Sequence, residues 1–149
     1  MKKITIIGAG YVGMSLATLL SKKSKVIVHD ISRSRVEQIN SRISTVKDKL
    51  IEEALRENAL HLSATDDSQE ALEDAELIII ATPTNYDEEK KYFDTSSVES
   101  CIKTAITLNS QALIVIKSTI PVGFTKAMNS FFQTDRIIFS PEFLREGHA

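Results

Sequence analysis

Three glycines and one carboxylate near the start of the sequence have the residue types and the spacing that could bind a dinucleotide. Gly8, Gly10 and Gly13 form the pattern G-x-G-x-x-G, and an acid, Asp30, lies twenty residues beyond Gly10. In such a turn the first glycine permits a tight bend, the second lets backbone approach a pyrophosphate, and the third allows close helix–strand packing. A helix that begins near Tyr11 would offer unpaired N–H groups and the positive end of its dipole to the diphosphate. The pattern predicts a dinucleotide site in which Asp30 accepts hydrogen bonds from the adenosine ribose.

The charge of Asp30 bears on which nicotinamide dinucleotide is expected. A carboxylate that accepts bonds from both ribose hydroxyls would repel a 2′-phosphate, which favours NAD over NADP. Arg33 and Arg35 keep the alternative open, because arginines after the second strand can also accept a 2′-phosphate. The glycines could instead form a plain structural turn, and Asp30 could be a solvated strand end. His29 carries no comparable signal and is expected to be a neutral strand histidine.

Hydroxyls, acids and prolines follow three later apolar runs. The segments ATPTNYD, KSTIPVG and SPEFLREG each contain one proline, and the three prolines of the sequence are Pro83, Pro121 and Pro141. Proline holds the backbone rigid just past a strand. Ligands of open α/β sheets bind at the carboxyl ends of the strands. The clustering therefore predicts that this one edge of a sheet carries the function.

Short apolar runs rich in β-branched residues alternate along the chain with longer helical patterns. Six strands are predicted at residues 2–8, 25–30, 60–65, 76–82, 112–119 and 136–140. Helices are predicted at residues 11–22, from Ser34 in a capping box with Glu37, and at residues 47–57, 97–108 and 124–132. Near-continuous apolar strands are typical of parallel sheets with helices on both faces. The alternation predicts an α/β fold of the Rossmann-type doubly wound class, with a mainly parallel six-stranded sheet and one long polar loop at residues 83–94.

Composition excludes several classes of function. The 149 residues include 42% hydrophobic and 26% charged residues with a formal net charge of −2, and we expect a single domain, residues 1–149. No basic surface is expected, so nucleic acid is not a predicted partner. Three glycines interrupt the apolar run near the amino terminus, which disfavours a secretory signal or a membrane span. The single cysteine suits a reducing compartment, so we expect a cytoplasmic protein with no metal site.

Four segments in order, GAGYVG, ATPTNYD, KSTIPVGFT and FSPEFLREG, resemble the amino-terminal domain of the UDP-glucose/GDP-mannose dehydrogenase family. The resemblance covers essentially the whole sequence, and the pair PTNYD and YFDT supports the branch that acts on UDP-glucose. It implies an NAD-dependent oxidoreductase that converts UDP-glucose to UDP-glucuronate in two hydride transfers with two NAD. It also implies that the full-length enzyme is a homodimer whose substrate is a nucleotide sugar.

The resemblance also assigns roles to individual positions. It implies cofactor contacts for Gly8, Gly10, Tyr11, Val12, Gly13, Asp30, Arg35, Thr82, Pro83, Thr84, Ser118, Thr119 and Glu146. It implies substrate contacts for Glu142, Phe143, Leu144, Arg145 and Glu146. Thr119 would help to place a catalytic water, and a glutamate would accept its proton, with Glu142 favoured over Glu146. The alternatives are local backbone capping by Thr119 and a solvated helical face for the two glutamates.

The family's nucleophile is a cysteine downstream of the segments quoted, with a supporting lysine and asparagine and a second nucleotide-binding domain. Cys101 is not expected to replace it, because it lies on the apolar face of the helix at residues 97–108, far from the edge where strands end, and buried thiols of this kind are inert. We therefore expect an excised domain or truncated product that binds NAD(H) without turnover. The alternatives are a dehydrogenase of GDP-mannose or a UDP-N-acetylhexosamine, and a non-catalytic dinucleotide-binding module.

Overall fold

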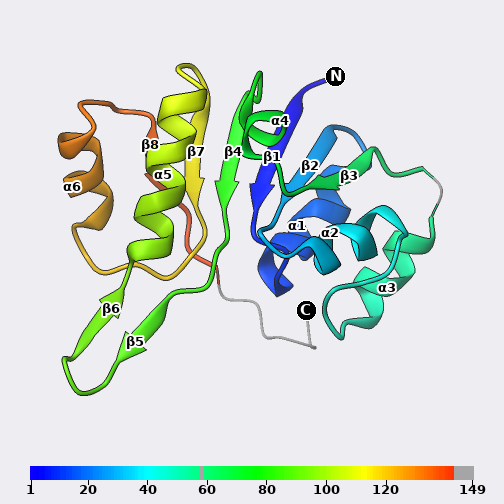
Figure 1. Cartoon of the computed structure of the whole chain (residues 1–149), viewed down its shortest axis with the longest axis horizontal. Helices are drawn as coiled ribbons and strands as arrows, with labels where there is room; N and C mark the ends of the chain where they lie inside the picture. Colours follow the sequence, from blue (N-terminus) through cyan, green and yellow to red (C-terminus); the bar gives the residue numbers. More distant parts are fainter. Residues whose placement is uncertain (58, 143–149) are drawn as a thin grey trace.

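Six parallel strands form the central sheet. The computed structural model describes residues 1–57 and 59–142. The strands are β1 (Lys3–Ile7), β2 (Lys25–His29), β3 (Leu62–Thr65), β4 (Leu77–Ile80), β7 (Leu113–Ile116) and β8 (Ile137–Phe139). Their spatial order is β3-β2-β1-β4-β7-β8, and every neighbouring pair is parallel (Figure 1). The order reverses between β1 and β4, as in the predicted doubly wound fold, so a ligand crevice is expected where these two strands end.

Helices cover both faces of this sheet. They are α1 (Tyr11–Leu20), α2 (Arg33–Asn40), α3 (Lys49–Arg56), α4 (Ser68–Leu72), α5 (Ser96–Leu108) and α6 (Phe124–Phe131). Successive side chains of a strand point to opposite faces. Accordingly, Ile4 and Ile6 of β1 are buried in a cluster with α1, α2 and α3, whereas Ile7 is buried with α4 and α5. Within the described residues, no helix is long and apolar enough to cross a membrane.

The segment predicted as a polar loop, residues 83–94, contains an antiparallel hairpin, so that prediction is wrong. Strand β5 (Asn85–Asp87) pairs with β6 (Tyr92–Asp94). The rings of Tyr86 and Phe93 meet edge to face with centroids 5.1 Å apart, which is a favourable cross-strand pair. The Asp87 carboxylate accepts the backbone N–H groups of Glu89 and Lys90 and so closes the turn. The hairpin projects from the edge at which the sheet strands end (Figure 1).

The predicted start of the second helix is also wrong. Helix α2 begins at Arg33, and its cap is Ser32, whose hydroxyl accepts the backbone N–H of Arg35 at 3.3 Å. The capping box at Ser34 therefore does not form. The reason lies two residues before the cap, where the Asp30 carboxylate accepts the N–H of Ser32 at 2.8 Å and bends the chain earlier than the helical pattern indicates.

Candidate functional site

Backbone hydrogen bonds hold the carboxyl ends of neighbouring strands side by side. After every strand of this sheet except the edge strand β3, the first residue donates its N–H to a neighbouring strand. The pairs are Gly8 to His29, Asp30 to Thr65, Ala81 to Ile7, Lys117 to Ile80 and Ser140 to Ile116, at 2.8 to 3.3 Å. The turns that follow these strands therefore start at fixed positions along a single edge. All three prolines follow strands of this edge, as predicted, after β4, β7 and β8.

The glycine turn after β1 has two positions that the fold requires and one that it leaves open. Gly8 has a φ of +109°, and a Cβ there would lie 2.7 Å from the carbonyl oxygen of Ala81. A Cβ on Gly13 would lie 2.0 Å from the carbonyl oxygen of Gly8. A Cβ on Gly10 would meet nothing within 4 Å, and Gly10 has no side chain to cap the first N–H groups of α1. The open approach and the helix N-terminus fit a diphosphate.

Asp30 is held in place beside this turn. Its side chain is about one tenth exposed. Oδ2 accepts the N–H of Ala9 at 2.9 Å, and Oδ1 accepts the N–H of Ser32 at 2.8 Å. A guanidinium nitrogen of Arg35 lies 3.7 Å from Oδ2. A carboxylate can accept about four hydrogen bonds, so Asp30 keeps acceptor capacity for ribose hydroxyls.

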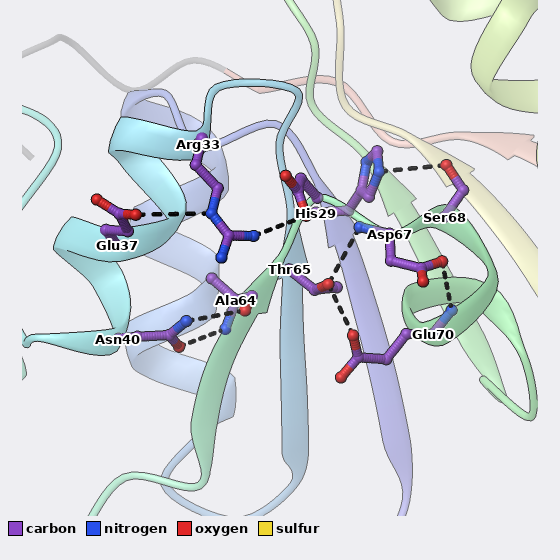
Figure 2. Close-up of polar contacts among 10 residues, drawn as sticks. His29, Arg33, Glu37, Asn40, Ala64, Thr65, Asp67, Ser68 and Glu70 are labelled. Atoms are coloured by element: carbon purple, nitrogen blue, oxygen red, sulfur yellow. Dashed lines mark hydrogen bonds and ion pairs between the residues drawn. The ribbon is translucent and has the colours of Figure 1, made fainter.

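The two arginines of α2 both lie opposite carboxylates. Arg35 pairs with Asp30, and Arg33 lies 3.1 Å from Asp66 and 3.6 Å from Glu37. Figure 2 shows Arg33 between α2 and the end of β3. Neither guanidinium therefore presents an unopposed positive charge to a 2′-phosphate, and the arrangement favours a dinucleotide without one.

The neighbouring ends of β2 and β3 are tied to α2 and α4 by further hydrogen bonds (Figure 2). The amide of Asn40 both donates to and accepts from the backbone of Ala64, at 3.0 and 2.9 Å. Thr65 donates to the carboxylate of Glu70 at 2.8 Å. His29 Nε2 lies 3.3 Å from the Ser68 hydroxyl. The Asn40 contacts satisfy backbone groups at the edge strand β3, and the two side-chain contacts join β2 and β3 to α4.

Two residues next to the glycine turn differ in what they can offer a ligand. The side chain of Tyr11, the first residue of α1, is buried in the core, so a cofactor contact would come from its backbone N–H. Val12 is only partly buried. Sequence reasoning missed Thr45, whose hydroxyl donates to the carbonyl oxygen of Ala9 at 2.6 Å. That contact fixes the turn from a residue far along the chain, and no local pattern indicates it.

The turns after β4 and β7 contact each other directly. Ser118 is buried and donates to the carbonyl oxygen of Thr82 at 2.6 Å. The hydroxyl of Ser97, at the start of α5, donates to the carbonyl oxygen of Pro83 at 3.0 Å. It also lies 3.5 Å from the side-chain hydroxyl of Thr82. The structure thus brings together three of the predicted cofactor residues, Thr82, Pro83 and Ser118.

Thr84 follows β4 and Thr119 follows β7, so both lie at this edge of the sheet. The side chain of Thr119 is exposed, and that of Thr84 is half-buried. The loop after Thr119 borders an apolar hollow of about 410 Å³, lined by residues 120–126 and Phe139. Hydroxyl groups and an apolar surface therefore adjoin where β7 ends.

The prediction that Cys101 lies far from the strand ends is wrong. Its thiol forms a hydrogen bond with the side chain of Thr82, directly after β4. The first turns of α5 start at this edge, so one face of the helix reaches it. Burial raises the pKa of the thiol from 9.0 to about 11, and the hydrogen bond with Thr82 opposes this only in part. The thiol is therefore protonated at neutral pH, as expected of an inert cysteine.

Lys117 is a second residue that sequence reasoning missed. Its ammonium group donates to the Ser140 hydroxyl at 3.1 Å and lies 3.7 Å from the carboxylate of Glu142. A charged residue at the end of an otherwise apolar strand was the available signal. Glu142 is thus placed at the edge shared with Thr119. The other members of the predicted strip lie outside the described residues: Phe143, Leu144, Arg145 and Glu146.

Known proteins resemble this chain in sequence and in fold. Residues 2–149 match the UDP-glucose/GDP-mannose dehydrogenase family, NAD binding domain. The chain is 54% identical over 147 residues to a UDP-glucose 6-dehydrogenase of Streptococcus pneumoniae and 45% identical over 149 residues to one of Campylobacter jejuni, covering 99% of this chain in both cases. It superposes with a TM-score of 0.85 and 28% identity on a UDP-glucose dehydrogenase of Pyrobaculum islandicum, over 100% of its length. The chain spans only 37% or 38% of these relatives.

Proposed function

Because the chain belongs to the UDP-glucose/GDP-mannose dehydrogenase family, whose NAD-binding domain it matches, we propose that it forms the cofactor half of an enzyme that oxidises UDP-glucose to UDP-glucuronate with two NAD. The observation that supports the substrate most strongly is the 54% identity to the Streptococcus pneumoniae relative. The open glycine turn beside a fixed carboxylate supports the cofactor.

We assign the cofactor-binding roles to the edge formed by the strand ends. The N–H groups at the start of α1 bind the diphosphate, with Gly10 providing the close approach. Asp30 accepts the ribose hydroxyls and repels a 2′-phosphate, and Arg35 stays paired with it. Thr82, Pro83, Thr84, Ser118 and Thr119 extend the cofactor contacts along the edge. When bound, NAD supplies the hydride acceptor.

The proposed catalytic roles lie at the ends of β7 and β8. Thr119 orients a water that hydrolyses a thioester between the oxidised substrate and the family's cysteine. Glu142 accepts a proton of this water as the water oxygen bonds the acyl carbon, and the carbon–sulfur bond breaks so that the thiolate leaves. That cysteine is proposed to lie in the part of the relatives that this chain does not match. Glu146 is the second candidate for the proton acceptor. Residues 142 to 146 together are proposed to bind the sugar nucleotide.

We propose that residues 1–149 form one domain of a longer, cytoplasmic, homodimeric enzyme whose partner is a nucleotide sugar. Size-exclusion chromatography of the full-length enzyme with light scattering measures the oligomeric state. A monomer at micromolar concentration would contradict the homodimer.

Enzyme assays test the proposed function directly. The full-length protein is expected to form two NADH for each UDP-glucose, measured by absorbance, and to act more slowly on GDP-mannose and on UDP-N-acetylhexosamines. The isolated chain is expected to bind NADH without turnover. A faster rate with another sugar nucleotide would show that the substrate is wrong, and no oxidation of any of them would favour a non-catalytic binding module.

A further inference from the structure

Lys117 follows β7 directly and is fixed at the carboxyl edge of the sheet. Its backbone N–H donates to the carbonyl oxygen of Ile80 on β4 at 2.8 Å. Only 13% of its side chain is exposed. Burying most of a charged ammonium group is unfavourable unless it has polar partners. The contacts of this group therefore indicate its role.

The ammonium group contacts three consecutive residues that follow β8. It donates to the Ser140 hydroxyl at 3.1 Å and to the carbonyl oxygen of Pro141 at 3.4 Å. Its nitrogen lies 3.7 Å from Oε2 of Glu142. Ser140 itself donates its N–H to Ile116 of β7 at 3.0 Å. The chain after β8 thus starts from a fixed point, and Lys117 holds its next two residues.

The contact with Glu142 differs from an ordinary surface ion pair. Its two side chains are 13% and 19% exposed, so solvent screens the charges less than at an open surface, where such pairs contribute little. The contacts with Ser140 and Pro141 are sufficient to tie the segment to the sheet. The carboxylate contact in addition restricts the orientation of Glu142.

We propose that Lys117 is a positioning residue that holds the carboxylate of Glu142 for proton transfer. The inference rests on the proposed role of Glu142 as the acceptor of the water proton. In that step one O–H bond of water breaks, the proton passes to Glu142, and Lys117 keeps its own protons. Without the ammonium group, Glu142 would lose the contact at 3.7 Å that restricts its orientation.

Kinetic measurements on the full-length enzyme test this inference. Lys117→Met is expected to lower kcat roughly 10- to 100-fold, the range for a misplaced catalytic group, with the KM for NAD changed less than about 2-fold. Glu142→Gln is expected to lower kcat by about 100-fold or more. The double variant should match Glu142→Gln within about 2-fold, because the two residues act as one unit. Lys117→Arg keeps the charge and should recover part of the loss.

A matched control and a binding measurement separate positioning from folding. Lys103→Met removes an exposed lysine of α5 and should leave kcat unchanged. Each variant should bind NAD within about 2-fold of wild type by calorimetry, which shows an intact domain. If Lys117→Met leaves kcat unchanged, or lowers it by the same factor with and without Glu142, the proposal is wrong.

Failure of the proposed function gives a different result. A wild-type enzyme that binds NAD but oxidises no nucleotide sugar would refute that function and leave no proton transfer for Lys117 to assist, which overturns the positioning role. Thermal unfolding then tests whether Lys117 and Glu142 interact. The shifts in Tm of Lys117→Met and Glu142→Gln should add to more than the shift of the double variant. Full additivity would show that the two side chains do not interact.

Discussion

Alanine substitutions at Gly10 and at Gly13 add the same methyl group to one turn, but one is expected to weaken ligand binding and the other to destabilise the fold. At Gly10 the backbone has a φ of −82° and a ψ of −165°, which any residue adopts, and the new Cβ meets nothing within 4 Å. At Gly13 the new Cβ would lie 2.0 Å from the carbonyl oxygen of Gly8. Gly10→Ala should therefore affect the ligand, and Gly13→Ala should affect the fold.

The magnitudes follow from these distances. Relieving the clash at Gly13 to an ordinary contact of about 3.5 Å requires a movement of roughly 1.5 Å between α1 and β1. Overpacking of this kind destabilises by about 3 kcal/mol, which for a chain of this size lowers Tm by roughly 6–12 °C. Gly10→Ala should leave stability unchanged or raise it by about 0.5 kcal/mol, because alanine restricts the unfolded chain. Its methyl group stands where the pyrophosphate approaches, so NAD affinity should fall by at least about 10-fold, or about 1.4 kcal/mol.

Two assays on the isolated chain decide the comparison. Circular dichroism during heating gives the Tm of each variant, and calorimetric titration gives the Kd for NAD. If Gly13→Ala melts at the wild-type temperature, the close approach of helix and turn is not a requirement of the fold. If Gly10→Ala binds NAD as tightly as wild type, the diphosphate does not lie at this turn.

Three further changes test other parts of the site. Asp30→Asn places an amide N–H₂ opposite one of two backbone N–H groups, so it should lower the free energy of unfolding by about 1–3 kcal/mol. It should also narrow the preference for NAD over NADP, and an unchanged preference in parallel titrations would contradict the role assigned to Asp30. Thr45→Val keeps the side-chain shape but loses the hydrogen bond to the glycine turn, and should lower the free energy of unfolding by about 1 kcal/mol in urea; wild-type stability would refute that contact. The pKa of Cys101 is raised from 9.0 to about 11, so the thiol ionises in the unfolded chain before it does in the folded chain. The free energy of unfolding, compared with that of Cys101→Ser, should therefore be constant below pH 9 and fall by about 2 kcal/mol as the pH rises through 11. A difference that stays flat from pH 8 to 11 would contradict the burial of the thiol.

The sheet and the glycine turn were predictable because their signals are local. Inner strands of a doubly wound sheet are covered on both faces, so they read as short apolar runs. All six strands of the sheet were found in the sequence. The parallel arrangement then requires the ends of all strands to share one edge. The hairpin at residues 83–94 was missed because its strands have three residues each, too few for a visible alternation of apolar and polar side chains.

The contacts that organise the site were not predictable, because they join residues distant in sequence. Thr45 reaches Ala9 across 36 positions, and Lys117 reaches Ser140 across 23. Cys101 was placed correctly on an apolar helix face, but a helical pattern does not indicate which turn of the helix lies beside a strand end. The cap of α2 is Ser32 and not Ser34, because Asp30 fixes the backbone after β2. Helix propensities do not take such a side-chain contact into account.

Calorimetric titration of the isolated chain with NAD and with NADP decides whether this strand edge is an NAD site. NAD is expected to bind to a single site, and NADP is expected to bind at least about 10-fold more weakly, because Asp30 repels a 2′-phosphate and both arginines of α2 face carboxylates. Equal or tighter binding of NADP, or the absence of binding by either dinucleotide, would contradict the assignment of this strand edge as an NAD site.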